Sequence, residues 1–238
     1  MSTLRGYKKS FTLIELLVVV GLSALILGLG IPAFNRMMRG NKVEECSGSI
    51  KLAIEQAQLR AASERRYVAV VFPNGAVNDS LKSYRLGGFR LAYVTKNTSG
   101  DGGYTFAKWV DGGWKNAPDG AILSQVRTSP YTPETNGDIK GCTAKVTDAL
   151  AGASELKSLS VKDDSGNALN AGTHNALIFN PYGGTAGNSK LYLLITEAVV
   201  NGDAVVYPSA GTTGGNRSAN YLVLKVNNLT GRVEYGNE

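Results

Sequence analysis

Two hydrophobic patterns follow one another along the N-terminal part of the chain, and both predict helix. From Leu16 to Phe34 there is no charged residue, and the apolar run extends back to Phe11 with Glu15 as its single charge. At about 1.5 Å of rise per residue, a helix of this length would cross a hydrocarbon core of about 30 Å. The first pattern therefore predicts a membrane-spanning helix over residues 11–34.

Beyond Phe34 the pattern becomes amphipathic. Apolar residues recur at spacings of three and four, with charged and polar residues between them, which is the period of a helix with one buried face. We therefore expect an amphipathic second half of the same helix over residues 35–65. The apolar stripe consists of Val43, Cys46, Ile50, Ala53, Ile54, Ala57 and Ala61.

After Arg66 the hydrophobic period shortens to that of β-strands, and Gly, Asn and Asp separate the runs. An α+β fold follows, in which an antiparallel β domain over residues 66–238 packs on the helix stripe. The segment from about 97 to 161 is expected to form an enlarged loop region. Candidate strands are Tyr67–Phe72, Ser83–Leu86, Phe89–Thr95, Tyr104–Val110, Ala121–Val126, Ala176–Phe179, Leu191–Thr196, Ala204–Tyr207, Tyr221–Val226 and Arg232–Tyr235.

Composition and charge add little about partners. The chain is 43% hydrophobic, which is enough for one sizeable core, and carries 25 Lys and Arg against 19 Asp and Glu, a formal charge of +6. Arg5, Lys8 and Lys9 lie in an N-terminal leader without acids, so half of this net charge belongs to the leader. The basic balance therefore does not indicate a nucleic-acid partner.

An ordinary secretory signal peptide would also begin with basic residues and an apolar run. Such a run covers 7 to 15 residues and ends at a small-residue cleavage site. Here the run is longer and a helix pattern follows it, which argues against that class of signal. A plain N-terminal anchor stays open, because basic residues flank the run on both sides and do not orient it.

Glu15 is explained by neither alternative. A carboxylate inside a spanning segment costs a few kcal/mol, and the helix dipole, worth about 0.3 to 1 kcal/mol, offsets only part of this cost. The sequence therefore predicts a positively charged partner for Glu15.

The residues around Glu15 resemble a known processing signal. Lys8 and Lys9 precede the small residue Ser10, Phe11 comes next, and Glu15 lies four positions after Phe11 at the start of the apolar run. This arrangement is similar to the class III signal of type IV prepilins and type II secretion pseudoprepilins. Ser10 stands where this family usually has Gly.

The resemblance implies that residues 1–10 are a leader peptide. A prepilin peptidase would cut between Ser10 and Phe11 on the cytoplasmic side and methylate the new Phe11 amine. Glu15 would face the N-terminus of a neighbouring subunit, and Pro32 falls where many pilins carry a helix-kinking proline. The implied partners are other pilins or pseudopilins, the prepilin peptidase and an inner-membrane assembly platform.

The β half resembles the GspH/FimT/FimU group of minor pseudopilins and minor pilins. The residues that carry this resemblance are Leu59-Arg60-Ala61-Ala62 leading into Val68-Ala69-Val70, then Phe179-Asn180-Pro181-Tyr182-Gly183, and Thr230-Gly231-Arg232-Val233. It implies a single-pass inner-membrane protein whose globular domain lies in the periplasm, or outside the cell in an assembled filament. FimT-like proteins carry a basic Gly-Arg-x-Arg run at the C-terminus. In this chain the corresponding run is Gly231-Arg232-Val233-Glu234. The second basic position is therefore acidic, which argues against DNA binding.

Residues for catalysis or metal binding are few. His174 is the only His, and Asp163-Asp164 is typical of a solvated turn. We therefore expect no enzymatic activity, no cofactor and no metal site. Cys46 and Cys142 would lie outside the cytoplasm, where a disulfide could persist. Either a disulfide between them or two unpaired buried thiols fits the sequence.

The sequence therefore predicts a minor pilin or pseudopilin that acts by assembly. The alternative is a membrane-tethered extracytoplasmic β domain that binds a ligand, including DNA in uptake, without polymerising.

Overall fold

The computed structural model describes residues 12–73, 79–97, 103–110, 112–133, 139–140, 142, 150, 155–169, 173–207, 217–218 and 220–236. It describes no side chains at 29–40, 79–80, 82, 140 and 217. The chain divides into two compact units, residues 1–39 and 40–238, which are described separately below.

A single long helix, α1 (Leu13–Glu64, 52 residues), forms the N-terminal part of the chain, as the sequence predicts. It ends where the backbone of Arg65 turns to a positive φ of 52°. The N–H of Arg66 then donates to the carbonyl of Ala61 at 3.2 Å. This is the hydrogen bond of a Schellman motif, and it satisfies a carbonyl that the last helical turn leaves unpaired.

The amphipathic half of α1 buries the stripe that its spacing predicts. Every member of the stripe is at most 2% exposed: Val43, Cys46, Ile50, Ala53, Ile54, Ala57 and Ala61. Because side chains three and four positions apart lie on one face of a helix, this stripe packs on the β-sheets as a continuous surface.

The larger sheet has six antiparallel strands. Along its main path the order is β3-β2-β1-β8-β7, and β4 pairs with β2. Ala69 at the centre of β1 pairs with Ala92 of β2 on one side and Ile178 of β8 on the other. The strands are β1 (Tyr67–Phe72), β2 (Gly88–Lys96), β3 (Tyr104–Trp109), β4 (Lys115–Asn116), β7 (Lys157–Leu159) and β8 (His174–Phe179).

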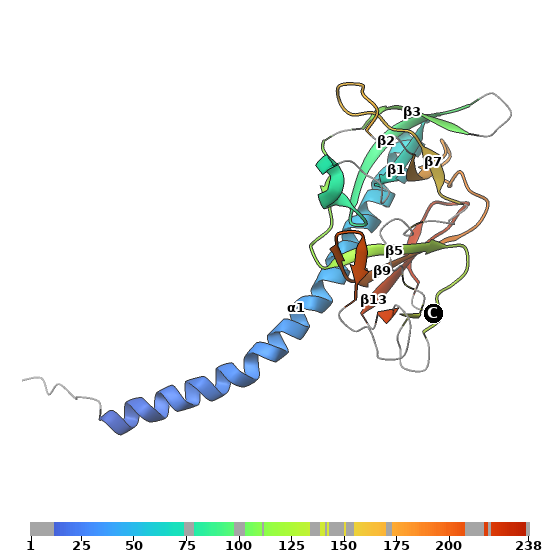
Figure 1. Cartoon of the computed structure of the whole chain (residues 1–238). Helices are drawn as coiled ribbons and strands as arrows, with labels where there is room; N and C mark the ends of the chain where they lie inside the picture. Colours follow the sequence, from blue (N-terminus) through green and yellow to red (C-terminus); the bar gives the residue numbers. More distant parts are fainter. Residues whose placement is uncertain are drawn as a thin grey trace, which may run out of the picture. The chain divides into compact units, whose positions relative to one another are not determined.

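A second antiparallel sheet has four strands in the order β14-β13-β9-β5. Figure 1 shows β5, β9 and β13 grouped together, apart from β1, β2, β3 and β7. The strands are β5 (Ala121–Arg127), β9 (Leu191–Glu197), β13 (Tyr221–Val226) and β14 (Val233–Tyr235). Two further pairs of strands form short antiparallel ribbons. In one, β10 (Val199–Asn201) pairs with β11 (Ala204–Val206). In the other, β6 (Ile139–Lys140) pairs with β12 (Arg217–Ser218).

Two hydrophobic cores stabilise the unit formed by residues 40–238. The larger core joins the α1 stripe to residues of both sheets, such as Val70 of β1 and Leu193 of β9. The smaller core contains Ala69, Val71, Ala92 and Ile178 of the six-stranded sheet, on the face opposite Val70.

The six-stranded sheet curls, so that its edge strands β3 and β7 approach one another. The indole N–H of Trp109, at the end of β3, donates to the carbonyl of Lys162 at 2.7 Å. Arg90 of β2 stacks on the Trp109 ring, 4.4 Å from its centroid, and its Nη2 donates to Oδ1 of Asp164 at 2.8 Å. These contacts fasten β2 and β3 to the chain that follows β7.

One sequence expectation differs from the fold. The strand predicted at Ser83–Leu86 is wrong, because a 3₁₀ helix, η1, covers Asp79–Tyr84 and Leu86 has a positive φ of 60° that no strand accommodates. The segment 97–161, expected as an enlarged loop region, contains β3 and β5 where strands are predicted over Tyr104–Val110 and Ala121–Val126. The other predicted strands are present with small shifts at their ends.

Candidate functional site

The start of α1 is a capping box built from Thr12 and Glu15. The carboxylate oxygen Oε2 of Glu15 accepts the backbone N–H of Thr12 and the Thr12 hydroxyl, both at 2.9 Å. The Glu15 N–H in turn donates to the Thr12 hydroxyl oxygen at 3.3 Å. Reciprocal bonds of this kind satisfy amides that the first helical turn leaves unpaired. The hydrophobic pattern does not reveal this role of Thr12, although the Thr-x-x-Glu spacing in the sequence is its signal.

The capping box gives Glu15 hydrogen bonds but no cation. Among the residues that the structure describes, no Lys or Arg forms an ion pair with its carboxylate. The positive partner that the sequence predicts for Glu15 is therefore not supplied by the described part of this chain.

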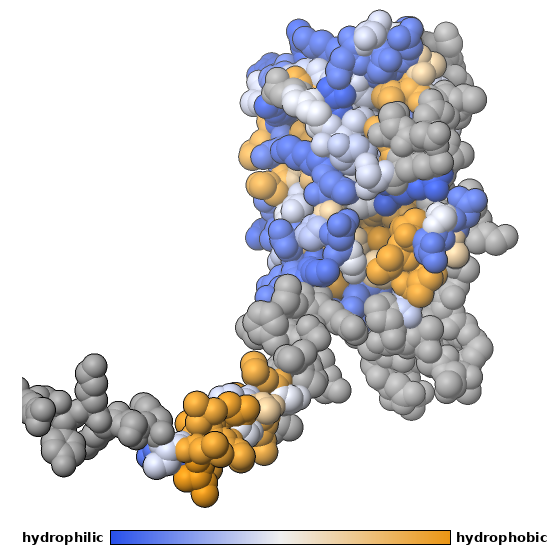
Figure 2. Space-filling model, turned by 60° about the vertical axis from the view of Figure 1, so that its left-hand side comes forward, coloured by the Kyte–Doolittle hydropathy of each residue, from blue (hydrophilic) through white to orange (hydrophobic). Residues whose placement is uncertain are grey.

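The apolar side chains that follow Glu15 are exposed. From Leu13 to Leu27 the large hydrophobic side chains are between 52% and 83% exposed. Figure 2 shows this part of α1 as mostly hydrophobic surface. Water is an unfavourable environment for so much contiguous apolar area, so this segment needs lipid or other protein around it.

Ser23 lies within this apolar segment and has a local partner. Its hydroxyl donates to the carbonyl of Val19 at 2.7 Å, one helical turn earlier. A hydroxyl bonded in this way needs no further partner when the helix is surrounded by apolar groups.

Within the part of the chain that the structure describes, no helix is both long and apolar enough to cross a membrane. The segment predicted to span, residues 11–34, passes beyond Gly28, the last residue of this stretch whose side chain is described. The predicted cleavage site at Ser10 and Phe11 also lies outside the described residues, as does the side chain of Pro32, and all three stay predictions.

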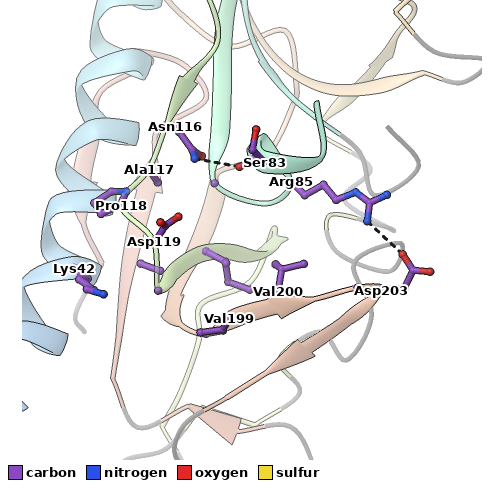
Figure 3. Close-up of a pocket in the computed structure, with 16 residues that line it drawn as sticks. Lys42, Ser83, Arg85, Asn116, Ala117, Pro118, Asp119, Val199, Val200 and Asp203 are labelled. Carbon is purple, nitrogen blue, oxygen red and sulfur yellow. Dashed lines mark hydrogen bonds and ion pairs between the residues drawn. The ribbon is translucent and has the colours of Figure 1, made fainter. Parts of the chain in front are cut away.

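A hollow of about 1,090 Å³ opens at one end of the four-stranded sheet. It lies between α1 at Lys42, the loop around Asp119 and the ribbon β10-β11 (Figure 3). Asn116 Nδ2 donates to the Ser83 carbonyl at 3.1 Å along one wall. This concave surface was not predicted from the sequence, because its lining comes from segments that are distant along the chain.

The lining of the hollow mixes apolar and charged groups. Val199 and Val200 provide aliphatic surface, and Arg85 Nη1 donates to Asp203 Oδ1 at 3.3 Å (Figure 3). Asp119 is exposed and has no ion pair within the described residues. A hollow with aliphatic walls and a free carboxylate suits a protein side chain better than a metal ion, which requires several converging ligands.

The two cysteines are free thiols, and both are buried. Burial raises the pKa of Cys46 to about 12, with a further contribution from the negative charge of Glu45. Burial also raises the pKa of Cys142 to about 11. The structure does not contain the disulfide considered from the sequence, and its formation in the exported protein stays a prediction.

The remaining polar residues have structural environments. His174 is buried, and burial lowers its pKa. Asp163 Oδ1 accepts the N–H of Asn167 at 2.8 Å and that of Ser165 at 2.9 Å, as in the turn that the sequence predicts. Asp164 pairs with Arg90. Within the described residues, no group of three or more His, Cys, Asp or Glu side chains could hold a metal ion.

Comparison with known proteins identifies the N-terminal segment. Residues 5–31 match the model of the prokaryotic N-terminal methylation motif. The chain carries the signal of type IV pilin-like proteins. This motif covers Ser10, Phe11 and Glu15, and it indicates a chain that prepilin peptidase processes. No curated protein and no solved structure matches the chain.

Proposed function

We propose that this protein is a minor pilin or pseudopilin, a subunit of a type IV pilus or of a type II secretion pseudopilus. It is anchored as a single-pass precursor in the bacterial inner membrane, cleaved between Ser10 and Phe11, and methylated at Phe11. Its globular unit then lies in the periplasm or on the assembled filament.

One observation carries this proposal: the methylation motif leads directly into a helix whose large apolar side chains, from Leu13 to Leu27, are exposed. Within the described residues, the amphipathic half of α1 packs on other parts of the chain, whereas the large apolar side chains from Leu16 to Leu27 are exposed. A bundle of packed helices from several subunits would cover these side chains, and Gly and Ala would allow close approach. The small residues of the segment include Gly21, Ala24 and Gly28.

Within such a bundle, Glu15 would pair with the freed N-terminal amine of a neighbouring subunit. The capping box already satisfies hydrogen bonds of the carboxylate, so the neighbour supplies the missing charge. A carboxylate left without a cation among apolar helices would be costly, and this cost would select the axial position of each subunit.

Replacing Glu15 separates these roles. Glu15→Gln keeps a side chain that can form a capping box but removes the charge, and Glu15→Val removes both. We expect both variants to be cleaved and methylated but to be lost from sheared filaments, as measured by immunoblot and mass spectrometry. Ser23→Ala is the matched control, because the Ser23 hydroxyl bonds to the carbonyl of Val19 in its own helix.

Normal incorporation of both Glu15 variants would contradict the assembly role. It would favour the second candidate, a tethered β domain that binds a ligand without polymerising.

The cleavage site has its own test. Ser10→Trp places a bulky side chain where the peptidase requires a small one, so we expect the precursor to accumulate at full length. Intact mass determines the N-terminus, and mature protein beginning at Phe11 in this variant would contradict the assignment.

A further inference from the structure

A second concave site lies beside α1, and we call it the tyrosine pocket. Its volume is about 500 Å³, and it lies between α1 at residues 41–44 and the sheet residues Tyr221, Leu222 and Tyr235. All of them belong to the unit formed by residues 40–238. The tyrosine pocket shares no lining residue with the hollow, so it is a separate site.

The sheet side of the tyrosine pocket is aromatic and aliphatic. Tyr235 of β14 is 48% exposed, and Tyr221 and Leu222 of β13 are half-buried. Strand pairing holds these residues in place, because Tyr235 pairs with Leu224 of β13. A side chain that enters the pocket therefore meets rings and a leucine that the sheet has already positioned, which reduces the entropy cost of binding.

The Tyr235 ring already accepts a cation. Lys51 Nζ of α1 lies over this ring, 4.7 Å from its centroid. A tyrosine ring attracts an ammonium or guanidinium group within about 6 Å of its centroid, because the face of the ring is electron-rich. About half of Tyr235 stays exposed beside Lys51, so the pocket keeps an aromatic surface for a second cationic side chain and its aliphatic stem.

Glu44 adds negative charge to the tyrosine pocket. It lines the pocket, and Glu45 follows it on α1; both residues are exposed. Neither carboxylate forms an ion pair with another residue in the described part of the chain. Lys42, the nearest cation along the helix, lines the hollow instead.

Other cations near the pocket have acidic partners of their own. Lys51 Nζ lies 4.0 Å from Glu55 Oε1. Lys225 Nζ and Arg232 Nε lie 4.0 Å and 3.6 Å from the carboxylate of Glu234. The carboxylate of Glu44 is therefore available to a cation from outside this chain.

We propose that the tyrosine pocket binds a lysine or arginine side chain of a different subunit of the same filament. The aliphatic stem of that side chain lies on Tyr221 and Leu222, and its charged end lies between Glu44 and the Tyr235 ring. A carboxylate beside an aromatic ring favours a cation and disfavours an acidic side chain. The contact needs no second copy of this chain, in agreement with a minor subunit. The inference rests on the proposed filament function and names the chemistry of one contact within it.

Photo-cross-linking in assembled filaments tests the contact. The full chain carries Tyr235→p-benzoylphenylalanine, and cross-linked peptides from sheared filaments are identified by mass spectrometry. We expect a product with another filament subunit, at a segment next to a Lys or Arg. Ser165→p-benzoylphenylalanine, on the exposed turn after β7, is the control for contacts that do not involve the pocket.

The charge of Glu44 decides whether this product reports the proposed contact. Glu44→Gln removes the charge, and Glu44→Lys places a like charge opposite the partner's cation. We expect the yield from position 235 to fall at least about threefold and at least about tenfold, respectively. Asp119→Asn and Asp119→Lys are the matched controls, because Asp119 is also exposed and lines the other concave site. They should leave the yield unchanged.

A charge exchange completes the test. Replacing the partner's basic residue by Glu should lower the yield alone and restore it in combination with Glu44→Lys. Equal yields with and without the Glu44 substitutions would overturn the proposal. A product confined to a segment without Lys or Arg, or to a second copy of this chain, would also overturn it.

The Glu15 variants separate this inference from the proposed function. The Glu44 variants should keep the wild-type denaturation midpoint, because Glu44 is exposed, so a lower yield reports lost contact. If the Glu15 variants are excluded from filaments while the Glu44 variants enter them and cross-link at the wild-type level, the pocket contact fails and the filament function stands. If the Glu15 variants enter filaments normally, the filament function itself fails.

Discussion

The two halves of α1 place their apolar side chains in opposite environments. From Leu13 to Leu27 these side chains are exposed, whereas from Val43 to Ala61 the stripe is almost completely buried. The buried half faces two β-sheets of its own chain, and within the described residues the exposed half has no comparable cover. One continuous helix thus contains a segment completed by folding and a segment that must be completed from outside.

The two halves gain the free energy of burying apolar side chains from different sources. Burying a Leu, Ile or Val side chain is worth about 1.5 to 3 kcal/mol. For the stripe this energy stabilises the unit of residues 40–238. For the apolar half it becomes available only in lipid or in contact with other subunits, so substitutions there should change assembly and leave folding unchanged.

The largest expected effect comes from the buried half. Ile54→Ala removes a fully buried side chain and should lower the free energy of unfolding by about 2 to 5 kcal/mol. Leu17→Ala, in the exposed half, should change it by less than about 0.5 kcal/mol. Denaturant titration of the full chain in detergent, followed by the fluorescence of Trp109 and Trp114, measures both. Equal losses for the two variants would contradict the comparison.

A smaller effect is expected at the curled sheet. The Arg90 side chain is 8% exposed, bonds to Asp164 and stacks on Trp109. Arg90→Met should lower the free energy of unfolding by about 1 to 2 kcal/mol, because Asp164 itself is exposed and stays solvated. Arg232→Met is the control, since its ion pair with Glu234 is on the surface and should contribute less than about 0.5 kcal/mol. An unchanged free energy of unfolding in Arg90→Met would show that the sheet keeps its curl without this contact.

A still smaller effect should depend on pH. Burial lowers the pKa of His174 in the folded chain, so as pH falls below about 6.5 the unfolded chain takes up the proton first. The contribution of His174 to stability is therefore present above this pH and is lost as pH falls towards the folded pKa. The denaturation midpoint should fall between pH 7.5 and pH 5, and His174→Asn should make this fall shallower. Because the chain has one His, an unchanged slope would contradict the assignment.

The cysteines give the smallest effect and the simplest measurement. Both thiols are buried with raised pKa values, so the folded chain should react slowly with iodoacetamide at pH 8. After unfolding without a reductant, the free thiols of the structure predict two adducts by intact mass. No adducts before reduction and two after it would show the disulfide instead.

Sequence periodicity predicted the helix and most of the strands because both depend on local burial. The members of the α1 stripe could be named one by one, since a period of three to four residues fixes which side chains share a face. The strand predicted at Ser83–Leu86 failed because Leu86 turns to a positive φ, which hydropathy does not report.

The candidate sites divide in the same way. The N-terminal motif is local in sequence, so Glu15 could be identified without a structure, and its bond to Thr12 had a readable signal. The hollow could not be identified from the sequence, because Lys42, Asp119 and Val200 come together only after two sheets and a helix have packed.

Ser23 shows how the apolar half of α1 can change surroundings. Its hydroxyl bonds to Val19 of the same helix, as Glu15 bonds to Thr12. These side chains keep their partners whether fatty acyl chains or neighbouring proteins surround the helix. If the proposed function holds, transfer of this helix from the bilayer into a filament would break neither hydrogen bond, and its main change would be the replacement of lipid contacts by contacts with other apolar helices.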